Sequence, residues 1–391
     1  MPELALAAHA PADVTAAVVT SRNAGLDALR ATLTLLVLFH HSAITYGAIG
    51  GWFYREVVTD GRLETKLLIF FCTLNQAYFM GLFFLLAGYF TPGSVDKNGA
   101  LFYLRERFLR LGIPLLVFGL LIGPATIALA LTAQGKPFLD SLLRLWARGT
   151  FENGPLWFAQ ALLIFSVLYL AWCGIAGPRF RSASRCAPAF PCNAVIALAA
   201  LVVGAAAFAL RLVWPVGTQW FGLQLGYFAS YVVLFVAGCI GSQGHWLERV
   251  PENPRRVWWL VSGCALPVLP AIVLSAPFFP WLRGDTSGGW NIQAAVYAVW
   301  EPLVAWGLIL VLLSRFHRVF VSLSPVWAAL SRRAYAIYII HPPVLVAIAL
   351  AWRTTAAPHL VKFGVTGMLT ALVCFAIAGL LVRIPLLKRI I

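Results

Sequence analysis

Long apolar stretches, separated by short polar connections, dominate the chain. A helix that crosses the hydrocarbon core of a bilayer needs roughly 17 to 25 mainly apolar residues, and ten stretches reach that length. They cover residues 26–49, 67–90, 108–131, 155–175, 194–213, 221–240, 257–275, 292–313, 334–351 and 360–384. Transmembrane strands would alternate apolar and polar positions, whereas these runs are continuous. The pattern predicts an all-α polytopic membrane protein with about ten transmembrane helices.

The polar parts of the chain predict one membrane domain without a separate soluble one. Residues 1–21 are rich in alanine, contain Pro2 and Pro11 and hold no long apolar stretch, so we expect a mobile N-terminal tail and no signal peptide. The connections between the expected spans are short, and the spans show no internal repeat of the kind common in transporters. Residues 22–391 are therefore expected to form a single transmembrane domain.

Composition agrees with a membrane protein and excludes a soluble one. Of 391 residues, 61% are apolar types and only 11% are charged, against about a quarter charged in soluble domains. The formal net charge of +15 would suggest nucleic acid for a soluble protein, but most of the 29 Lys and Arg residues here lie at the two ends and in the even-numbered connections. The positive-inside rule then predicts a multi-pass protein of the inner (cytoplasmic) membrane, with both termini in the cytoplasm and no nucleic-acid partner.

The seven cysteines give no sign of a metal site or a disulfide framework. Most lie inside apolar runs, and no two have the CxxC spacing of a zinc or redox motif. We expect cysteines that face lipid or the protein core, and no bound metal.

Ionisable residues inside the expected spans are the first candidates for chemistry, because a charge in lipid is costly. Arg30 and His41 lie in the first span. Eleven helical steps make nearly three full turns and advance the helix by about 16 Å. Both side chains are therefore expected on one face, with Arg30 nearer the cytoplasm and His41 deeper. The alternative is that Arg30 extends to the membrane surface and His41 only packs.

Glu301 and His341 are the other two ionisable candidates. Glu301 is the one carboxylate near the middle of an expected span, and either a catalytic role or a hydrogen bond that fixes helix packing would explain it. His341 precedes Pro342 and Pro343, which donate no backbone hydrogen bond and leave carbonyls one turn earlier free for other donors. A kinked helix in which the histidine binds such a carbonyl is the alternative to a catalytic histidine.

Two clusters at span ends have the chemistry of substrate-binding residues. Arg107 and Arg110 share a helical face on the expected cytoplasmic side, and the arginine fork suits phosphate. Anchoring to lipid headgroups is the alternative. On the opposite side, Glu152, Asn153 and Trp157 offer hydrogen bonds and a ring on which a sugar can stack, although an aromatic belt at the membrane surface explains the tryptophan equally well.

Together these motifs resemble the acyltransferase 3 family of integral-membrane acyltransferases, in particular its glucan-biosynthesis-protein-C-like branch. The stretch Gly25–Arg30 followed by His41 is similar to the family signature of an arginine, ten residues and a histidine. Further blocks resemble the family at Ala87–Phe90, Arg107–Arg110, Pro155–Phe158 and Tyr335–His341. At the first of these the family often has serine in place of Ala87. The resemblance extends over nearly the whole chain, without the extra soluble hydrolase-like domain that some members carry.

The resemblance implies transfer of an acyl group from cytoplasmic acyl-coenzyme A to a hydroxyl, often on a glycan, at or across the membrane. We hypothesise that His41 is the general base and that Arg30 supports either the oxyanion or the charge of the donor. Two further roles complete the hypothesis. Phosphate groups of coenzyme A would bind Arg107 and Arg110, and Glu301 or His341 would orient the base.

Two points of this mechanism stay open. Direct transfer and an acyl-histidine intermediate are both compatible with the residues. The depths of the two histidines do not match, because helical rise places His341 only about 11 Å from the cytoplasmic end of its span, shallower than His41.

Two other functions are compatible with the same residues. A transporter or flippase would use Arg30, Glu301 and the histidines as a proton or substrate path. A haem-binding electron carrier would use His41 and His341 as axial ligands.

Overall fold

The computed structural model describes residues 23–183 and 187–390, and within these ranges the chain forms helices and no strand. Nine helical stretches there are long and apolar enough to cross a membrane. They are α1 (Ala24–Thr45), α2 (Leu63–Asn98), α3 to η3 (Ala100–Gln134), α7 (Trp157–Ala183) with its first turn η4 (Gly154–Leu156), α8 (Asn193–Val213), α10 (Glu252–Ala265) joined to α11 (Val268–Ser275), α12 (Ile292–Val319), α13 (Pro325–Ala351) and α14 (His359–Leu381). The all-α polytopic fold is confirmed, while the expected tail, residues 1–21, lies outside the described residues.

The sixth expected span is shorter than the sequence predicts. Its helix covers only Leu225–Gly241, of which α9 is Phe228–Gly241. Before it, Trp220 and Leu223 exchange backbone hydrogen bonds of 2.9 Å around Gly222, whose φ is 75°. A positive φ is tolerated by glycine and ends regular helix geometry. The first expected residues of this span therefore stay outside the helix, and nine full-length spans replace the expected ten in the described part of the chain.

A proline shapes the third span and ties it to another helix. The π-helical turn η1 (Phe108–Gly112) precedes Pro114, which cannot donate a hydrogen bond to the carbonyl of Arg110. Tyr335 Oη on α13 donates to that carbonyl instead, at 2.7 Å. An unsatisfied carbonyl in lipid costs several kcal/mol, so the missing hydrogen bond at Pro114 strongly favours this contact between the third span and α13.

The same arrangement recurs ten residues further on. The second π-helical turn, η2 (Phe118–Ile122), precedes Pro124, and the freed carbonyl of Leu120 accepts a hydrogen bond from Trp146 Nε1 at 2.8 Å. Trp146 belongs to the short helix α6 (Phe138–Ala147), which is thereby held against the span.

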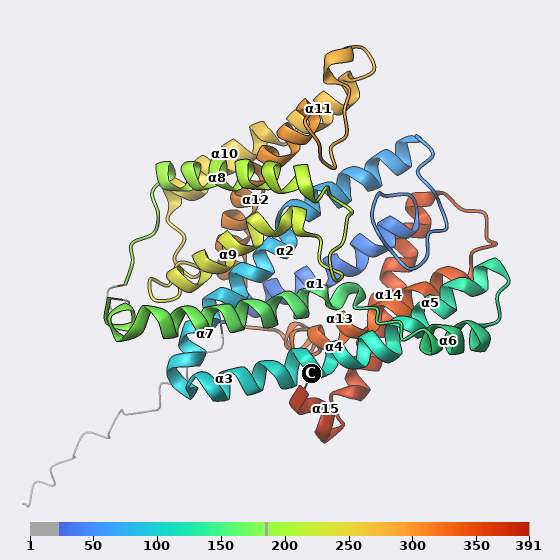
Figure 1. Cartoon of the computed structure of the whole chain (residues 1–391), viewed down its shortest axis with the longest axis horizontal. Helices are drawn as coiled ribbons and strands as arrows, with labels where there is room; N and C mark the ends of the chain where they lie inside the picture. Colours follow the sequence, from blue (N-terminus) through green and yellow to red (C-terminus); the bar gives the residue numbers. More distant parts are fainter. Residues whose placement is uncertain (1–22, 184–186, 391) are drawn as a thin grey trace, which may run out of the picture.

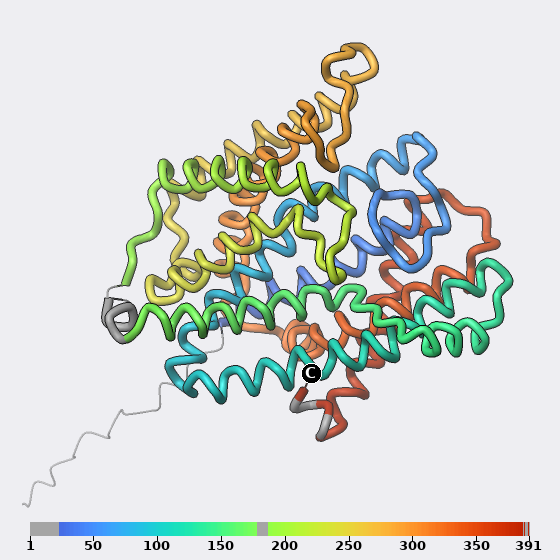
Figure 2. Tube along the Cα trace, in the orientation of Figure 1, coloured from blue at the N-terminus to red at the C-terminus, as the bar shows by residue number. Residues whose placement is uncertain are grey.

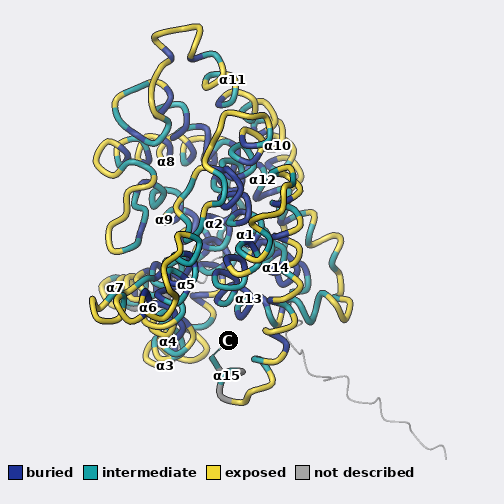
Figure 3. The backbone as a smooth tube through the Cα atoms, turned by 90° about the vertical axis from the view of Figure 1, so that its right-hand side faces the viewer, coloured by how far each residue is buried: buried dark blue, intermediate teal, exposed yellow. Residues whose placement is uncertain are grey.

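Helix α1 lies in the middle of the bundle and contacts α2, α12, α13 and α14. Figure 1 shows α10 and α11 along one edge of the molecule and α3 along the opposite edge, with α1 between them. In Figure 3, buried residues concentrate around α1, α12 and α13, whereas the outer helices are largely exposed. Because α1 carries both Arg30 and His41, these candidates belong to the best-enclosed helix of the fold.

The start of α1 and the end of α14 lie at the same end of the bundle. A Cβ on Gly25 would lie 2.9 Å from the backbone of His317 at the end of α12. A Cβ on Gly379, near the end of α14, would lie 2.9 Å from the Arg333 guanidinium, near the start of α13. We call this the even end, since the even-numbered connections lie here, and the opposite one the odd end. That the even end faces the cytoplasm stays a prediction.

The connection between α1 and α2, residues 46–62, folds back onto the odd end of the bundle. The amides of Glu56 and Val57 donate to Thr45 O at 2.9 and 3.2 Å, and the Glu56 carboxylate forms an ion pair with Lys362 on α14. In Figure 2 this blue segment coils beside the red start of α14. Tyr46 is hydrogen-bonded to Thr366 at 2.8 Å, and burial raises the pKa of its phenol to about 12. The connection is therefore a fixed part of the fold.

Helices α2 and α9 approach each other through two glycines. A Cβ on Gly88 would lie 2.1 Å from the carbonyl oxygen of Phe235, and a Cβ on Gly238 would lie 2.2 Å from that of Leu85. Small residues at a helix–helix interface allow this close packing in membranes.

We predict that Gly88→Ala destabilises the protein by about 1–3 kcal/mol, because the added methyl group overpacks a contact with a rigid backbone. Thermal unfolding of the purified protein in detergent measures the effect. The matched control is Gly93→Ala on the same helix, where nothing lies within 4 Å of the new Cβ. Equal melting temperatures for the two variants would contradict the close approach of α2 and α9.

Candidate active site

His41 on α1 and His341 on α13 are hydrogen-bonded to each other. Nδ1 of His41 lies 3.0 Å from Nε2 of His341, and the two rings are within 12° of parallel. His341 is fully buried, whereas His41 is partly accessible. Of the two residues expected to orient His41, the structure brings His341 to it.

Pro342 determines which nitrogen of each ring carries a proton. It donates no hydrogen bond to the carbonyl of Tyr338, four residues earlier, and His341 Nδ1 lies 2.7 Å from that oxygen. A carbonyl only accepts, so Nδ1 of His341 is the donor and, in the neutral ring, its Nε2 is an acceptor. His41 must then donate from Nδ1, which leaves the lone pair of its Nε2 free. The alternative in which His341 satisfies the freed carbonyl is correct, and it is compatible with a free lone pair on Nε2 of His41.

The expected mismatch in depth between the two histidines is wrong. Helix α13 begins at Pro325, well before the expected start of the span at residue 334. His341 is therefore roughly 24 Å along its helix, and His41 roughly 26 Å along α1, at a rise of 1.5 Å per residue. Tyr335, which is hydrogen-bonded to the third span, lies on α13 between its start at Pro325 and His341.

A cavity of about 1420 Å³ reaches His41 from the odd end. The connections that line it are all odd-numbered: residues 49–55, 152–155, 216–224 and 284–287, with further lining from α1, α2, α11, α12 and α13. Its lining on α1 extends inward to Val37. The free nitrogen of His41 thus belongs to a ring that borders a space large enough for a substrate.

Glu152, Asn153 and Trp157 all line this cavity together with His41. Glu152 Oε1 accepts a hydrogen bond from the amide of Gly154 at 2.9 Å, and Asn153 Nδ2 donates to Gln160 Oε1 at 2.8 Å. These bonds hold the two polar side chains in place before any substrate arrives. The structure therefore brings the three expected substrate-binding residues to the same space as the candidate base.

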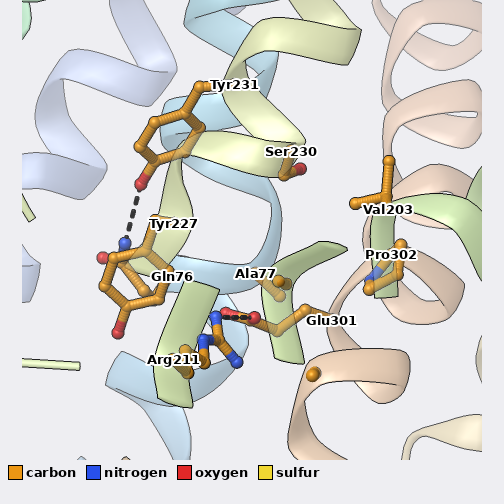
Figure 4. A pocket seen from close by; sticks show the side chains of 11 residues that line it. Gln76, Ala77, Val203, Arg211, Tyr227, Ser230, Tyr231, Glu301 and Pro302 are labelled. Carbon is orange, nitrogen blue, oxygen red and sulfur yellow. Dashed lines mark hydrogen bonds and ion pairs between the residues drawn. The ribbon is translucent and has the colours of Figure 1, made fainter. Parts of the chain in front are cut away.

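Three aromatic rings extend the wall of the cavity. Trp157 stacks on Tyr231 with centroids 5.7 Å apart, and Tyr231 stacks on Tyr227 at 6.3 Å, with interplanar angles of 24° and 27°. Gln76 Nε2 donates to the Tyr231 hydroxyl at 2.9 Å, as the dashed line in Figure 4 shows. The rings, with the amide of Gln76 and the tyrosine hydroxyls beside them, give this part of the wall both apolar and hydrogen-bonding groups.

Arg30 does not belong to this cavity. Its side chain is 42% exposed near the even end, with Nη1 3.7 Å from the carboxylate of Asp27. It shares a helical face with His41, as expected, but about 16 Å of helical rise separates the two. Arg30 therefore does not line the cavity with His41, and the distance excludes a contact between Arg30 and an oxyanion held at His41, which is one of its two expected roles.

Arg107 and Arg110 also lie outside the cavity lining. Arg107 lies over the ring of Tyr103 at 5.0 Å, and Arg110 pairs with Glu106 at 3.4 Å while 63% of its side chain stays exposed. Arg110 lies in the π-helical turn η1, so the angle around the helix between Arg107 and Arg110 differs from that of two residues three apart in a regular α-helix. Both arginines remain at the even end, opposite the mouth of the cavity.

Glu301 has a partner other than His41. Its carboxylate forms an ion pair with the Arg211 guanidinium at the end of α8, and both side chains are buried. Arg211 Nε also donates to Gly226 O at 3.0 Å, and its guanidinium lies over the rings of Tyr227 and Tyr297 at 5.2 and 4.8 Å. Figure 4 shows the pair side by side in a small cavity. Glu301 therefore does not orient His41. It joins α12 to α8 through Arg211, as the alternative of a packing role predicts.

Sequence reasoning misses two residues of this region. Arg211 counts in the sequence only as one of the basic residues of an odd-numbered connection, but the structure buries it completely. Trp52, in a connection with no motif, stacks on His41 with centroids 3.9 Å apart. A buried carboxylate such as Glu301 needs a cation, and the search for one is the signal that could have found Arg211.

The histidine pair does not fit a haem. Two axial ligands approach the iron from opposite faces of the porphyrin, whereas His41 Nδ1 and His341 Nε2 share a direct hydrogen bond of 3.0 Å. The ring cannot pass between them. We therefore derive no electron-transfer function.

We predict that Glu301→Gln destabilises the protein by about 3–5 kcal/mol, because it leaves the Arg211 charge buried without a partner. Replacing both residues, Arg211→Met with Glu301→Leu, is expected to restore most of the loss. Melting temperatures in detergent test both statements. The control is Glu252→Gln, which breaks the exposed pair with Arg255 and should change little. Additive losses in the double variant would show that the ion pair does not control stability.

Comparison with known proteins identifies the family of the chain. A family model described as an acyltransferase domain, that of acyltransferase family 3, matches residues 23–386. No curated protein and no solved structure gives a match. The matched region contains both histidines of the pair, the arginines of the third span and the aromatic wall of the cavity. The chain therefore belongs to the acyltransferase 3 family of membrane acyltransferases.

Proposed function

We propose that this membrane acyltransferase moves an acyl group from acyl-coenzyme A to a hydroxyl of a glycan acceptor, with His41 as the general base. One observation carries the proposal: the hydrogen bonds of His341 leave the lone pair on Nε2 of His41, and His41 lines the large cavity. A hydroxyl needs a base to attack a thioester, and imidazole titrates in the suitable range.

In the proposed reaction, one nitrogen, Nε2 of His41, both takes up and returns the proton. Nε2 of His41 removes the hydroxyl proton as the acceptor oxygen attacks the thioester carbonyl. The tetrahedral intermediate then expels the coenzyme A sulfur, which takes the proton from His41. One ester bond forms, one thioester bond breaks, and the histidine is regenerated. The hydrogen bond from His41 Nδ1 to His341 supports the positive charge that His41 carries between these steps. An acyl-histidine route would use the same nitrogen as nucleophile.

The lining of the cavity supports a glycan as the acceptor. Trp157, Tyr231 and Tyr227 present stacked rings, and Glu152 and Asn153 supply hydrogen-bonding groups beside them. Sugars bind through this combination of ring stacking and hydrogen bonds to hydroxyls. The mouth lies at the odd end, so we propose that the acceptor reaches His41 from the non-cytoplasmic side of the inner membrane.

The donor is proposed to bind at the even end. Arg110 offers an exposed guanidinium group there and Arg107 a half-buried one, and Arg30 adds a third on the face of α1 that leads to His41. The cavity stops at Val37, roughly 10 Å of helical rise from Arg30. The thioester arm of acyl-coenzyme A would cross this interval, where Leu33 and Val37 pack with the core, and the phosphates would stay on the arginines.

We expect His41→Ala to reduce acyl transfer by about 10²- to 10⁴-fold, because the acceptor hydroxyl loses its base. The assay follows label from radioactive acyl-coenzyme A in membranes that contain the full-length protein. His341→Gln serves as the matched variant, since its amide oxygen can still accept the hydrogen bond from His41 and should retain more activity than His341→Ala. Transfer at the normal rate in folded His41→Ala would contradict the proposal. Passage of a substrate across the membrane without label transfer would favour a transporter.

A second prediction concerns the donor. Arg107→Ala combined with Arg110→Ala should raise KM for acyl-coenzyme A roughly tenfold or more, since each lost phosphate contact costs at least about 1 kcal/mol. KM for the acceptor should stay the same. Arg256→Ala, at an exposed position of the even end, is the control for a general loss of positive charge. An unchanged KM in the double variant would leave these arginines as membrane anchors only.

A further inference from the structure

Trp52 covers one face of the histidine pair. Its indole is within 9° of parallel to both rings, with centroids 3.9 Å from His41 and 5.9 Å from His341. With the 5.1 Å between the histidines, these three separations form a triangle whose angle at His41 is close to a right angle. The histidines therefore lie side by side in nearly one plane, joined by their hydrogen bond, and the indole lies over His41.

The fold holds Trp52 in this position from both sides. The backbone amides of Glu56 and Val57, shortly after Trp52, bind the end of α1, and the carboxylate of Glu56 pairs with Lys362 on α14. Phe53 packs edge-on against the indole with centroids 5.1 Å apart. The connection 46–62 therefore delivers a fixed aromatic face to His41, and nothing in the family motifs of the sequence includes it.

The chemistry of the step needs such a face. His41 becomes an imidazolium when it takes the proton of the acceptor, and a cation over an aromatic face is stabilised by the ring quadrupole. Stacking also restrains rotation of the imidazole about its side-chain bonds. A base that is displaced by about 1 Å can lose roughly 10²-fold in rate.

We infer that Trp52 is a positioning residue of the transfer reaction: its indole face fixes the plane of the His41 ring and stabilises the charge that His41 carries during the step. The inference rests on the proposed role of His41 as base. It adds a residue that acts through His41 and makes no claim on the acceptor. Its effect therefore belongs in kcat, not in the binding of either substrate.

The test compares Trp52→Leu, which removes the aromatic face, with Trp52→Phe, which keeps a smaller one. In the acyl-transfer assay with purified full-length protein, we expect Trp52→Leu to lower kcat by about 10- to 100-fold, with KM for both substrates within about twofold of the original. Trp52→Phe should recover most of kcat. The control is Trp281→Leu, an exposed tryptophan of another odd-numbered connection, which should behave like the unaltered protein.

A second variant guards against misfolding of Trp52→Leu. Glu56→Gln breaks the ion pair with Lys362 and substitutes no residue of the cavity lining; because it loosens the connection that holds Trp52, it should also lower kcat, by a smaller factor. A raised acceptor KM with normal kcat in Trp52→Leu would make Trp52 a binding surface and overturn the inference. Normal kcat in both variants would overturn it as well. These outcomes leave the His41→Ala result untouched, so the two proposals fail separately.

Discussion

The need to satisfy every backbone carbonyl in lipid determines how this site is built. Pro342 removes one helical hydrogen bond, and the carbonyl of Tyr338 that it frees accepts a hydrogen bond from His341 Nδ1. From that bond and the bond between the two histidines follow the tautomer of both rings and the free nitrogen of His41. Pro114 acts in the same way on the third span, where the freed carbonyl of Arg110 binds a side chain of α13. Each proline removes a hydrogen bond within its own helix and so leaves a carbonyl free to bind a side chain.

Much of the fold and of the site can be predicted from the sequence, because lipid imposes simple rules of length and polarity. Continuous apolar runs locate the spans, and the cost of ionisable groups in them singles out His41, His341 and Glu301. The spacing of prolines predicts a free carbonyl near His341, and the structure confirms it. The cluster at Glu152 and Trp157 lines the cavity with His41, which follows from the distinctive local sequence at the start of that span.

What the sequence does not predict depends on contacts between distant segments. Arg30 and His41 share a helical face, yet a common face does not make a common cavity when the two lie at different depths. Glu301 is buried with Arg211, ninety residues away, and no local pattern links them. Trp52 lies in an irregular connection whose path depends on the ion pair between Glu56 and Lys362. Helical periodicity describes each helix well, but it does not describe how loops fold back over them.

The short sixth helix has a consequence for what can reach His41. Leu225–Gly241 extends roughly 26 Å at 1.5 Å per residue, less than the hydrocarbon thickness of about 30 Å. The turn before it, which carries cavity residues Gln219 and Gly222, therefore supplies part of the remaining thickness with irregular backbone, and Trp220 and Phe221 in it are exposed. The wall of the cavity at this point is therefore a loop, held by the hydrogen bonds between Trp220 and Leu223, and not a helix. Substitutions in this loop can therefore change the mouth of the cavity without shortening a transmembrane helix.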